Sequence, residues 1–408
     1  MRLLVVSEWF PYPPIAGAKI RAYNLIRQLA RLAEIDLVAQ VRTLTPAQLA
    51  AGKDHLGQFC RTVEAVPMIP YQYSYGKALR TLVDPVPPVV RYMRNKPLEQ
   101  AVAVRWGQGY DAAVATISGY PSATLRSLVA LGVRPLVADS LELGVFRPKM
   151  QKLSMRRIRN TVTWWHMRRF TRRILGDVDV VTVTSDAERE LFGDLLHAPD
   201  QCIVMPNVLD MRDYDGQYGP RDYSALLYAG SFGYIANYEA MLWFTREVFG
   251  HITGREDFKV RVTGNTAGRD LAPLREACPQ IEFTGFVDDI RPYFAESGIC
   301  IVPILSGGST RLKIVEAMAW GTPVVSTRIG AEGLEVTHNE DILLADTPLD
   351  FAKAIERLVG DRDLWQRISA GGRRLVEERY SADRMYHQLD EVLSGLTALE
   401  KLPLKKGR

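Results

Sequence analysis

A short reach of chain, residues 307–316, combines glycines, two cations and a carboxylate: it reads Gly-Gly-Ser-Thr-Arg-Leu-Lys-Ile-Val-Glu. Its first three residues form a backbone that can approach a ligand without bulky side chains in the way. A helix is expected over about 312–320, because this stretch is rich in good helix formers. Helix N-termini attract anions through free N–H groups, and Arg311 and Lys313 add positive charge there. The pattern therefore predicts a phosphate site.

Several other chemistries lack their motifs. Neither half of the chain has a G-x-G-x-x-G dinucleotide fingerprint after its first strand, and no P-loop or G-x-S-x-G nucleophile elbow is present. The six histidines are scattered without ligand spacing, which argues against a protein-built zinc site. We therefore expect no metal site and no cofactor.

The elements that must position this segment alternate between strands and helices. After a first strand, a helix is expected over 17–33. Apolar runs with little alternation, typical of buried parallel strands, occur at 3–7, 35–41, 111–116, 136–139 and 178–184, and again at 225–229, 259–264, 281–284, 298–302, 323–327 and 342–344. The polar stretch 210–222 between the two sets is predicted to be a linker. The fold class is therefore α/β, with two Rossmann-like doubly wound domains facing a cleft.

Length and composition fit this architecture. The chain has 408 residues, enough for two domains, and a formal net charge of +4. Its four cysteines lie far apart with no C-x-x-C pair, which indicates reduced thiols in a cytoplasmic protein. The apolar run at the N-terminus is too short for a signal peptide or a membrane span, so it is interpreted as a first buried strand.

In combination, the motifs of this sequence resemble those of the retaining GT-B glycosyltransferases of family four, which use nucleotide-sugar donors. The resemblance covers nearly the whole chain and is densest over 226–393. Its landmarks are a proline-rich loop leading into Gly17, Pro206-Asn207 at the hinge, the segment 283–290 at the nucleobase loop, and above all the segment 311–325 followed by 330–333.

The resemblance implies a site and domain boundaries. Glu316 corresponds to the ribose-binding glutamate, and Arg311 and Lys313 would neutralise the leaving diphosphate. Donor-binding positions would be Gly17, Arg21, Gly230, Ser231, Gly285, Phe286, Val287, Gly307, Gly308, Ser309, Thr310, Leu312 and Glu316. The N-terminal, acceptor-side domain is expected over 1–205 with a crossover helix over 381–408, and the C-terminal, nucleotide-sugar-binding domain over 206–380.

The sequence departs from the family pattern at three places. The loop 230–237 carries no positive charge, so its usual arginine and lysine are replaced by Arg311 and Lys313. Gly308 stands where many members have a first glutamate, which defines a subgroup. Asp139 stands at a strand end where many members have histidine. That carboxylate could contact the acceptor hydroxyl, act as a general base, or simply cap the following turn. For Arg21, phosphate binding and a structural role are equally supported.

One segment concerns the acceptor. Residues 149–173 contain nine Lys or Arg and no acid, with Trp164, Trp165, Met167 and Phe170 interleaved. Such helices dock on anionic lipid headgroups. A packed helix with a solvated basic face is an equally supported alternative, and nucleic acid ranks last.

These observations predict a metal-independent enzyme that transfers a hexose-type sugar from a nucleoside diphosphate to a hydroxyl with retention. The acceptor would be a carbohydrate or a lipid-linked molecule in polysaccharide or glycoconjugate assembly, and the protein would be cytoplasmic, with a peripheral membrane contact through 149–173. The alternatives are a nucleotide-sugar epimerase and a non-catalytic nucleotide-sugar-binding protein of the same fold. The base and sugar of the donor stay open.

Overall fold

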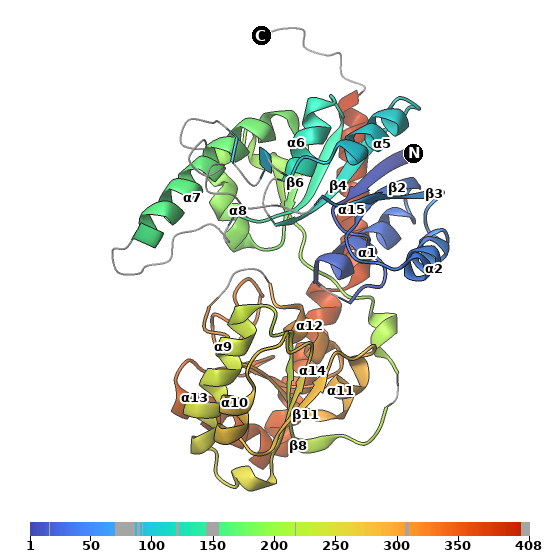
Figure 1. The fold of residues 1–408 in the computed structure, drawn as a ribbon. Coiled ribbons are helices and arrows are strands. Elements are labelled where there is room, and N and C mark those ends of the chain that lie inside the picture. The colour runs from blue at the N-terminus through green and yellow to red at the C-terminus, as the bar shows by residue number, and fades with distance from the viewer. Residues whose placement is uncertain are drawn as a thin grey trace. The chain divides into compact units, whose positions relative to one another are not determined.

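The computed structural model describes residues 1–15, 17–69, 86–87, 90–91, 93–119, 122–143, 155–216, 218–306 and 310–400. Contacts within the chain divide it into two units (Figure 1). Unit 1 consists of Met1–Pro206 and Met385–Arg408, and unit 2 of Asn207–Arg384. The sequence predicts divisions after residues 205 and 380, whereas the contacts divide the chain after 206 and 384.

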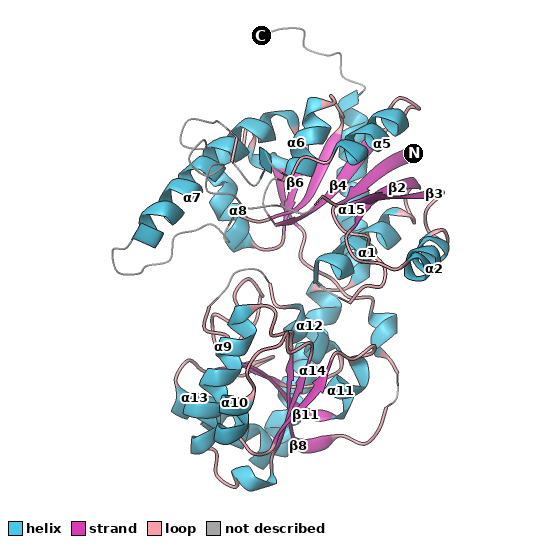
Figure 2. Ribbon diagram, in the orientation of Figure 1, coloured by secondary structure: helices cyan, strands magenta, loops and turns pink. Residues whose placement is uncertain are grey.

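Unit 1 is built on a parallel sheet of seven strands in the order β3-β2-β1-β4-β5-β6-β7. The strands are β1 (Arg2–Ser7), β2 (Glu34–Val41), β3 (Thr62–Pro67), β4 (Ala112–Gly119), β5 (Leu136–Leu141), β6 (Val180–Val183) and β7 (Cys202–Val204). The described helices are α1 (Gly17–Leu29), α2 (Pro46–Leu56), α5 (Lys96–Trp106), α6 (Ala123–Ala130), α7 (Met155–Ile174) and α8 (Asp186–Phe192). Helices flank the strands in each unit (Figure 2).

Unit 2 is built on a parallel sheet of six strands in the order β10-β9-β8-β11-β12-β13. The strands are β8 (Asp222–Ala229), β9 (Lys259–Thr263), β10 (Ile281–Gly285), β11 (Ser297–Val302), β12 (Val324–Ser326) and β13 (Leu343–Leu344). The helices are α9 (Ile235–Trp243), α10 (Ala272–Ala277), α11 (Arg291–Glu296), α12 (Leu312–Ala319), α13 (Pro348–Gly360), α14 (Arg362–Arg379) and α15 (Ala382–Glu400), the last of which continues into unit 1.

Two doubly wound parallel sheets confirm the α/β fold class, and eleven strands match the predicted apolar runs. The sequence analysis missed β3 and β7. Both are edge strands: β3 is mostly half-exposed and β7 has three residues. A central strand of such a sheet is buried on both faces and reads as a continuous apolar run, as β1 does, whereas an edge strand carries a weaker signal.

Each sheet has one position where the chain order reverses. In unit 1 it lies between β1 and β4, and in unit 2 between β8 and β11. Connections from the two neighbouring strands then leave toward opposite sides, which opens a crevice at the carboxyl ends of the strands. The loops after β8 and β11 are therefore the places in unit 2 where a ligand is expected.

The prediction of a linker over 210–222 was wrong for its first part. Met211–Tyr214 forms a 3₁₀ turn, and the Tyr214 side chain is buried, with its ring centroid 5.6 Å from that of Trp320. The polar composition of this stretch concealed the aromatic side chain that anchors it to unit 2.

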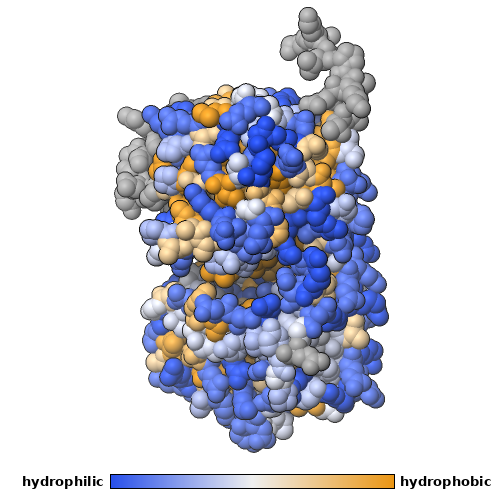
Figure 3. All heavy atoms as spheres, turned by 90° about the vertical axis from the view of Figure 1, so that its right-hand side faces the viewer, coloured by the Kyte–Doolittle hydropathy of each residue, from blue (hydrophilic) through white to orange (hydrophobic). Residues whose placement is uncertain are grey.

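Within the described residues, no helix is long and apolar enough to cross a membrane. On the face drawn in Figure 3, hydrophilic residues predominate, and hydrophobic residues form groups between them. The four cysteines are buried and unpaired.

Candidate functional site

Two glycines bring the loops of β8 and β9 into backbone contact at the carboxyl edge of the unit 2 sheet. Gly264 directly follows β9 and has a φ of +124°. A Cβ added to Gly264 would lie 2.7 Å from the carbonyl carbon and oxygen of Gly230, which follows β8. Any side chain at Gly264 would therefore displace this loop.

Helix α12 carries the two charged residues that the sequence singles out. It begins directly after Arg311, which is half-exposed at the N-cap, and its residues Ile314 and Val315 are buried in the hydrophobic core. Lys313 and Glu316 lie three positions apart on the helix and so share a face. Burial of the apolar face thus fixes the direction in which both charges point.

The Lys313 ammonium lies against the loop after β8. Nζ donates a hydrogen bond to Asn237 Oδ1 at 3.2 Å and lies 4.2 Å from the ring centroid of Tyr228. A Cβ at Gly230 would lie only 2.7 Å from Nζ, so the glycine leaves the space that the ammonium fills. Burial lowers the Lys313 pKa to about 7. The loop after β8 contains no Lys or Arg of its own, and the Lys313 ammonium of α12 lies against it instead.

Asn237 holds this arrangement together. Its Oδ1 also accepts from the Tyr228 hydroxyl at 2.8 Å, and its Nδ2 donates to the Ser231 carbonyl oxygen at 2.8 Å. The Gly233 N–H in turn donates to Ser231 Oγ at 3.2 Å. The sequence analysis assigned no role to Asn237 or Tyr228. One sequence feature could have indicated Asn237: it is an asparagine at the start of α9, directly after the glycine-containing loop. Polar side chains at such positions commonly form hydrogen bonds to backbone groups.

Glu316 is held in an equally unusual environment. Its Oε1 accepts a long hydrogen bond, 3.5 Å, from the Tyr214 hydroxyl. Burial raises the Glu316 pKa to about 7, and it raises the pKa of Tyr214 well above its ordinary value. A carboxylate that has only one weak donor retains the capacity to accept further hydrogen bonds from a ligand.

The other predicted positions of unit 2 that the structure describes lie near the same edge of the sheet. Gly285 ends β10 with a φ of +70°, its carbonyl oxygen accepts from the Gly264 N–H at 2.8 Å, and the Phe286 side chain that follows is 56% exposed. Val287 and Leu312 are half-buried. Thr310 is buried, and its Oγ1 accepts from Asn207 Nδ2 at 2.9 Å. Gly307, Gly308 and Ser309 lie outside the described residues.

In unit 1 the predicted residues form a buried ion pair. Arg21 Nη2 donates to Asp139 Oδ1 at 2.6 Å and Nε to Oδ2 at 3.0 Å, while the Thr182 hydroxyl donates to Oδ1 at 2.6 Å. Arg21 Nη1 also donates to the Met205 carbonyl oxygen at 2.9 Å. Asp139 is 1% exposed and Arg21 is 4% exposed.

This geometry favours the structural alternative for both residues, because both carboxylate oxygens are engaged and the pair joins α1 to β5, to β6 and to the residue that follows β7. Gly17 is the first residue of α1, as expected.

Helix α7 presents a basic and aromatic face. From Thr161 onward, its exposed side chains include Val162, Trp165, Arg169, Arg172 and Arg173, which recur at helical spacing, while Met167, Phe170 and Ile174 are buried. The Arg169 guanidinium lies 5.7 Å from the Trp165 ring centroid. Arg168 differs, because it is ion-paired with Asp194. The side chains of 155–160 and all of 149–154 lie outside the described residues.

The described residues contain no group of three or more His, Cys, Asp or Glu that could hold a metal ion. Lys313 and Arg311 bring positive charge to the edge of the unit 2 sheet, and Arg269 Nε donates to the Phe232 carbonyl oxygen in the loop after β8 at 3.3 Å.

Part of the chain matches a known protein family. Residues 224–361, within unit 2, match the family model described as Glycosyl transferases group 1. The lipopolysaccharide core biosynthesis glycosyltransferase LpsE of Rhizobium meliloti is 32% identical over 108 residues, which cover 26% of this chain and 31% of LpsE. The matched segments span less than half the length of the curated relatives.

Solved structures match over nearly the whole chain. HepE from Anabaena, solved with UDP and glucose, superposes with a TM-score of 0.66 at 17% identity and covers 97% of this chain and 100% of its own. WaaG, a glycosyltransferase involved in lipopolysaccharide biosynthesis, gives a TM-score of 0.62 at 12% identity over 97% of this chain and 100% of its own. These likenesses establish the GT-B fold.

Proposed function

We propose that this chain is a glycosyltransferase that moves a sugar from a nucleoside diphosphate to an acceptor hydroxyl, with retention, in polysaccharide or glycoconjugate assembly. One observation carries the proposal. A half-buried lysine from α12 lies against the glycine-containing loop at the switch point of unit 2, one helical turn before a half-buried glutamate. A cation beside a loop that follows a parallel strand is suited to a phosphate, and a carboxylate nearby is suited to a ribose.

The diphosphate, the ribose and the base of a nucleotide would each contact a different group of residues at the carboxyl edge of the unit 2 sheet. The diphosphate would contact Lys313, Arg311 and the backbone around Gly230 and Ser231. The ribose hydroxyls would donate to Glu316. The base would lie at the Gly285–Val287 turn, where the exposed Phe286 ring provides a flat apolar surface.

The leaving group explains why a desolvated lysine is useful. When the glycosidic bond breaks, negative charge grows on the diphosphate, and preorganised cations at that point stabilise it. A diphosphate beside Lys313 favours the ammonium form and so reverses the effect of burial on its pKa. In this reaction the acceptor hydroxyl attacks on the face that the diphosphate leaves, and a donor phosphate oxygen helps take its proton. Neither a protein nucleophile, a metal ion nor Asp139 as a general base is then required.

A panel of nucleotide sugars incubated with the protein and no acceptor tests the proposal. Slow hydrolysis of one donor to free sugar and nucleoside diphosphate is the expected result, and it identifies base and sugar together. Isomerised donor would mean an epimerase, and donor that is bound but intact would mean a binding protein. Lys313→Met should slow this hydrolysis by about 10²–10³.

For the acceptor, we propose that the exposed face of α7 contacts the anionic cytoplasmic surface of a membrane. Each basic residue near such a surface contributes about 1 kcal/mol, and Trp165 is suited to the interface. Replacing Arg169, Arg172 and Arg173 with Gln should reduce co-sedimentation with phosphatidylserine vesicles at low salt and leave donor hydrolysis unchanged. Equal co-sedimentation of wild type and variant would contradict the contact. Arg255→Gln, an exposed arginine of unit 2, is the control.

A further inference from the structure

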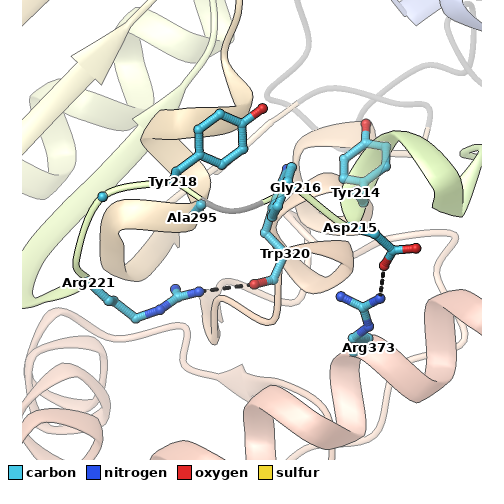
Figure 4. A pocket seen from close by; sticks show the side chains of 9 residues that line it. Tyr214, Asp215, Gly216, Tyr218, Arg221, Ala295, Trp320 and Arg373 are labelled. Atoms are coloured by element: carbon cyan, nitrogen blue, oxygen red, sulfur yellow. Dashed lines mark hydrogen bonds and ion pairs between the residues drawn. The ribbon is translucent and has the colours of Figure 1, made fainter.

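Unit 2 has a groove of about 430 Å³ at the C-terminal end of α12. Tyr214 and Tyr218 stand on either side of Trp320, and Arg221 and Arg373 approach from below (Figure 4). A volume of 300–1,000 Å³ is typical of small-molecule sites. Nothing in the proposed transfer reaction uses this groove.

The groove has hydrogen-bond donors that lack acceptors. Trp320 is only 7% exposed, and its buried indole N–H has no hydrogen-bond partner among the described residues. A buried donor left unbonded costs about 1–3 kcal/mol, so such groups are rare unless a ligand or water completes them.

Arg221 adds a cation that has no counter-ion among the residues that the structure describes. Its Nη1 donates to the Ser297 carbonyl oxygen and to Thr322 Oγ1, both at 2.7 Å, and its Nη2 donates to the Trp320 carbonyl oxygen at 3.0 Å. These three partners are neutral, and the charged neighbour Arg362 is another cation that, together with burial, lowers the Arg221 pKa. A guanidinium has five N–H donors, so in the described part of the chain two remain for a ligand.

The carboxylates in and beside the groove already have ion-pair or hydrogen-bond partners within the protein. Asp215 pairs with Arg373 at 2.6 Å, and Arg373 is also paired with Glu377 at 3.0 Å. At the rim, Glu296 Oε1 accepts from the Gly219 N–H at 3.2 Å. Among the described residues, the groups of the groove left without partners are therefore hydrogen-bond donors, the Trp320 N–H and two N–H groups of Arg221, beside three aromatic rings.

We propose that this groove binds a small molecule that carries an oxyanion, a phosphate or a carboxylate, on a sugar-sized ring. The oxyanion accepts from the Trp320 N–H and from the remaining N–H groups of Arg221. The ring lies against Tyr218, whose side chain is partly exposed and whose ring centroid is 5.1 Å from that of Trp320. The proposal does not depend on the transferase activity, because every residue it uses lies outside the nucleotide site except Tyr214, which also contacts Glu316.

Calorimetric titration of the full chain tests this site with four probes: inorganic phosphate, glucose 6-phosphate, glucuronate and uncharged glucose. At least one anionic sugar should bind at least tenfold more tightly than glucose, and comparison of the two anionic sugars distinguishes phosphate from carboxylate. Tighter binding of phosphate alone than of either anionic sugar would overturn the role of the rings. No binding by any anionic probe would overturn the site.

Variants then locate the binding. Arg373→Gln should weaken it at least tenfold, because it removes a cation and leaves the Asp215 carboxylate without its guanidinium, whereas Asp215→Asn should strengthen it because it removes a negative charge from the groove. Trp320→Phe keeps a ring but removes the N–H and should also weaken binding, and if it fails to fold, the Arg373 and Asp215 variants decide. Lys313→Met and the control Arg255→Gln should bind normally. Binding lost in Lys313→Met would place the probe at the nucleotide site, and equal binding by all variants would exclude the groove.

Discussion

Both units bury charged side chains close to the carboxyl ends of their strands, but the charges are satisfied in opposite ways. In unit 1, Arg21 and Asp139 bond to each other through two hydrogen bonds, and Thr182 and Met205 complete the pair. In unit 2, Lys313 is bonded to an amide oxygen and a ring face, Glu316 receives one long hydrogen bond, and burial shifts the pKa of both to about 7.

The difference separates a structural pair from a candidate binding site. A buried charge that has a bidentate partner has nothing left to offer a ligand, and removing one member leaves the other uncompensated. Buried charges without an ion-pair partner destabilise the empty protein and are stabilised when a ligand brings the opposite charge or the missing hydrogen bonds. Burial of a charged residue is therefore no sign of function unless its partners are known.

The largest expected effect concerns unit 1. Arg21→Met should lower the free energy of unfolding by about 3–5 kcal/mol, because the Asp139 carboxylate stays buried without its guanidinium. Urea denaturation measures this. Arg134→Met is the matched control, since it breaks the exposed pair with Asp179 and should cost about 1 kcal/mol or less. If both variants lost the same free energy of unfolding, the buried Arg21–Asp139 pair would be no more important for stability than an exposed ion pair.

The second prediction concerns turnover. Lys313→Met should lower kcat by about 10²–10³ with little change in donor KM, because the cation acts on charge that grows in the transition state. Its melting temperature should not fall, since burial disfavours the charged lysine. Arg311→Ala should lower kcat in the same way. The control is Lys259→Met, an exposed lysine at the opposite end of β9. Near-normal kcat in Lys313→Met would show that the diphosphate is neutralised by other groups.

The third prediction concerns the ribose. Glu316→Gln should weaken binding of the nucleoside diphosphate by about 1.5–3 kcal/mol, the contribution of hydrogen bonds to a charged group. A 2′,3′-dideoxy nucleoside diphosphate should bind wild type and variant about equally. Calorimetry with both ligands measures the difference. A variant that still discriminates between them as strongly as wild type would refute the assignment.

The smallest predicted effect is the uptake or release of protons when the nucleoside diphosphate binds. Lys313 has a pKa of about 7 in the empty protein, so at pH 8 it is mostly neutral, and a diphosphate that raises this pKa must cause proton uptake of less than about one proton per site. At pH 6 the sign should reverse, because Glu316, with a raised pKa of about 7, loses its proton to become the acceptor of the ribose hydroxyls.

Calorimetry in buffers of different ionisation enthalpy measures both. Lys313→Met should abolish the uptake at pH 8 and leave the release at pH 6. Uptake that persists in this variant would show that another group titrates on binding.

The sequence by itself determined the elements. The apolar runs fixed the central strands, because a strand covered on both faces must be apolar throughout. The composition of 312–320 likewise fixed α12, which places Lys313 and Glu316 on one face. The edge strands β3 and β7 and the anchored turn at Met211–Tyr214 were missed, since their burial depends on neighbours far along the chain.

Only the tertiary structure decided which residues the charged side chains of the two units contact. Lys313 bonds to Asn237, 76 positions earlier, and Arg21 bonds to Asp139, 118 positions later. Periodicity shows which face of an element is buried, but not which element lies against it. In these parallel sheets that choice depends on strand order, which places α12 beside the loop after β8 and α1 beside β5. For this reason the sequence analysis treated both Arg21 and Lys313 as candidates to bind an anion. Only packing showed that Arg21 is bonded to a carboxylate, whereas Lys313 has no ion-pair partner in the part of the chain that the structure describes.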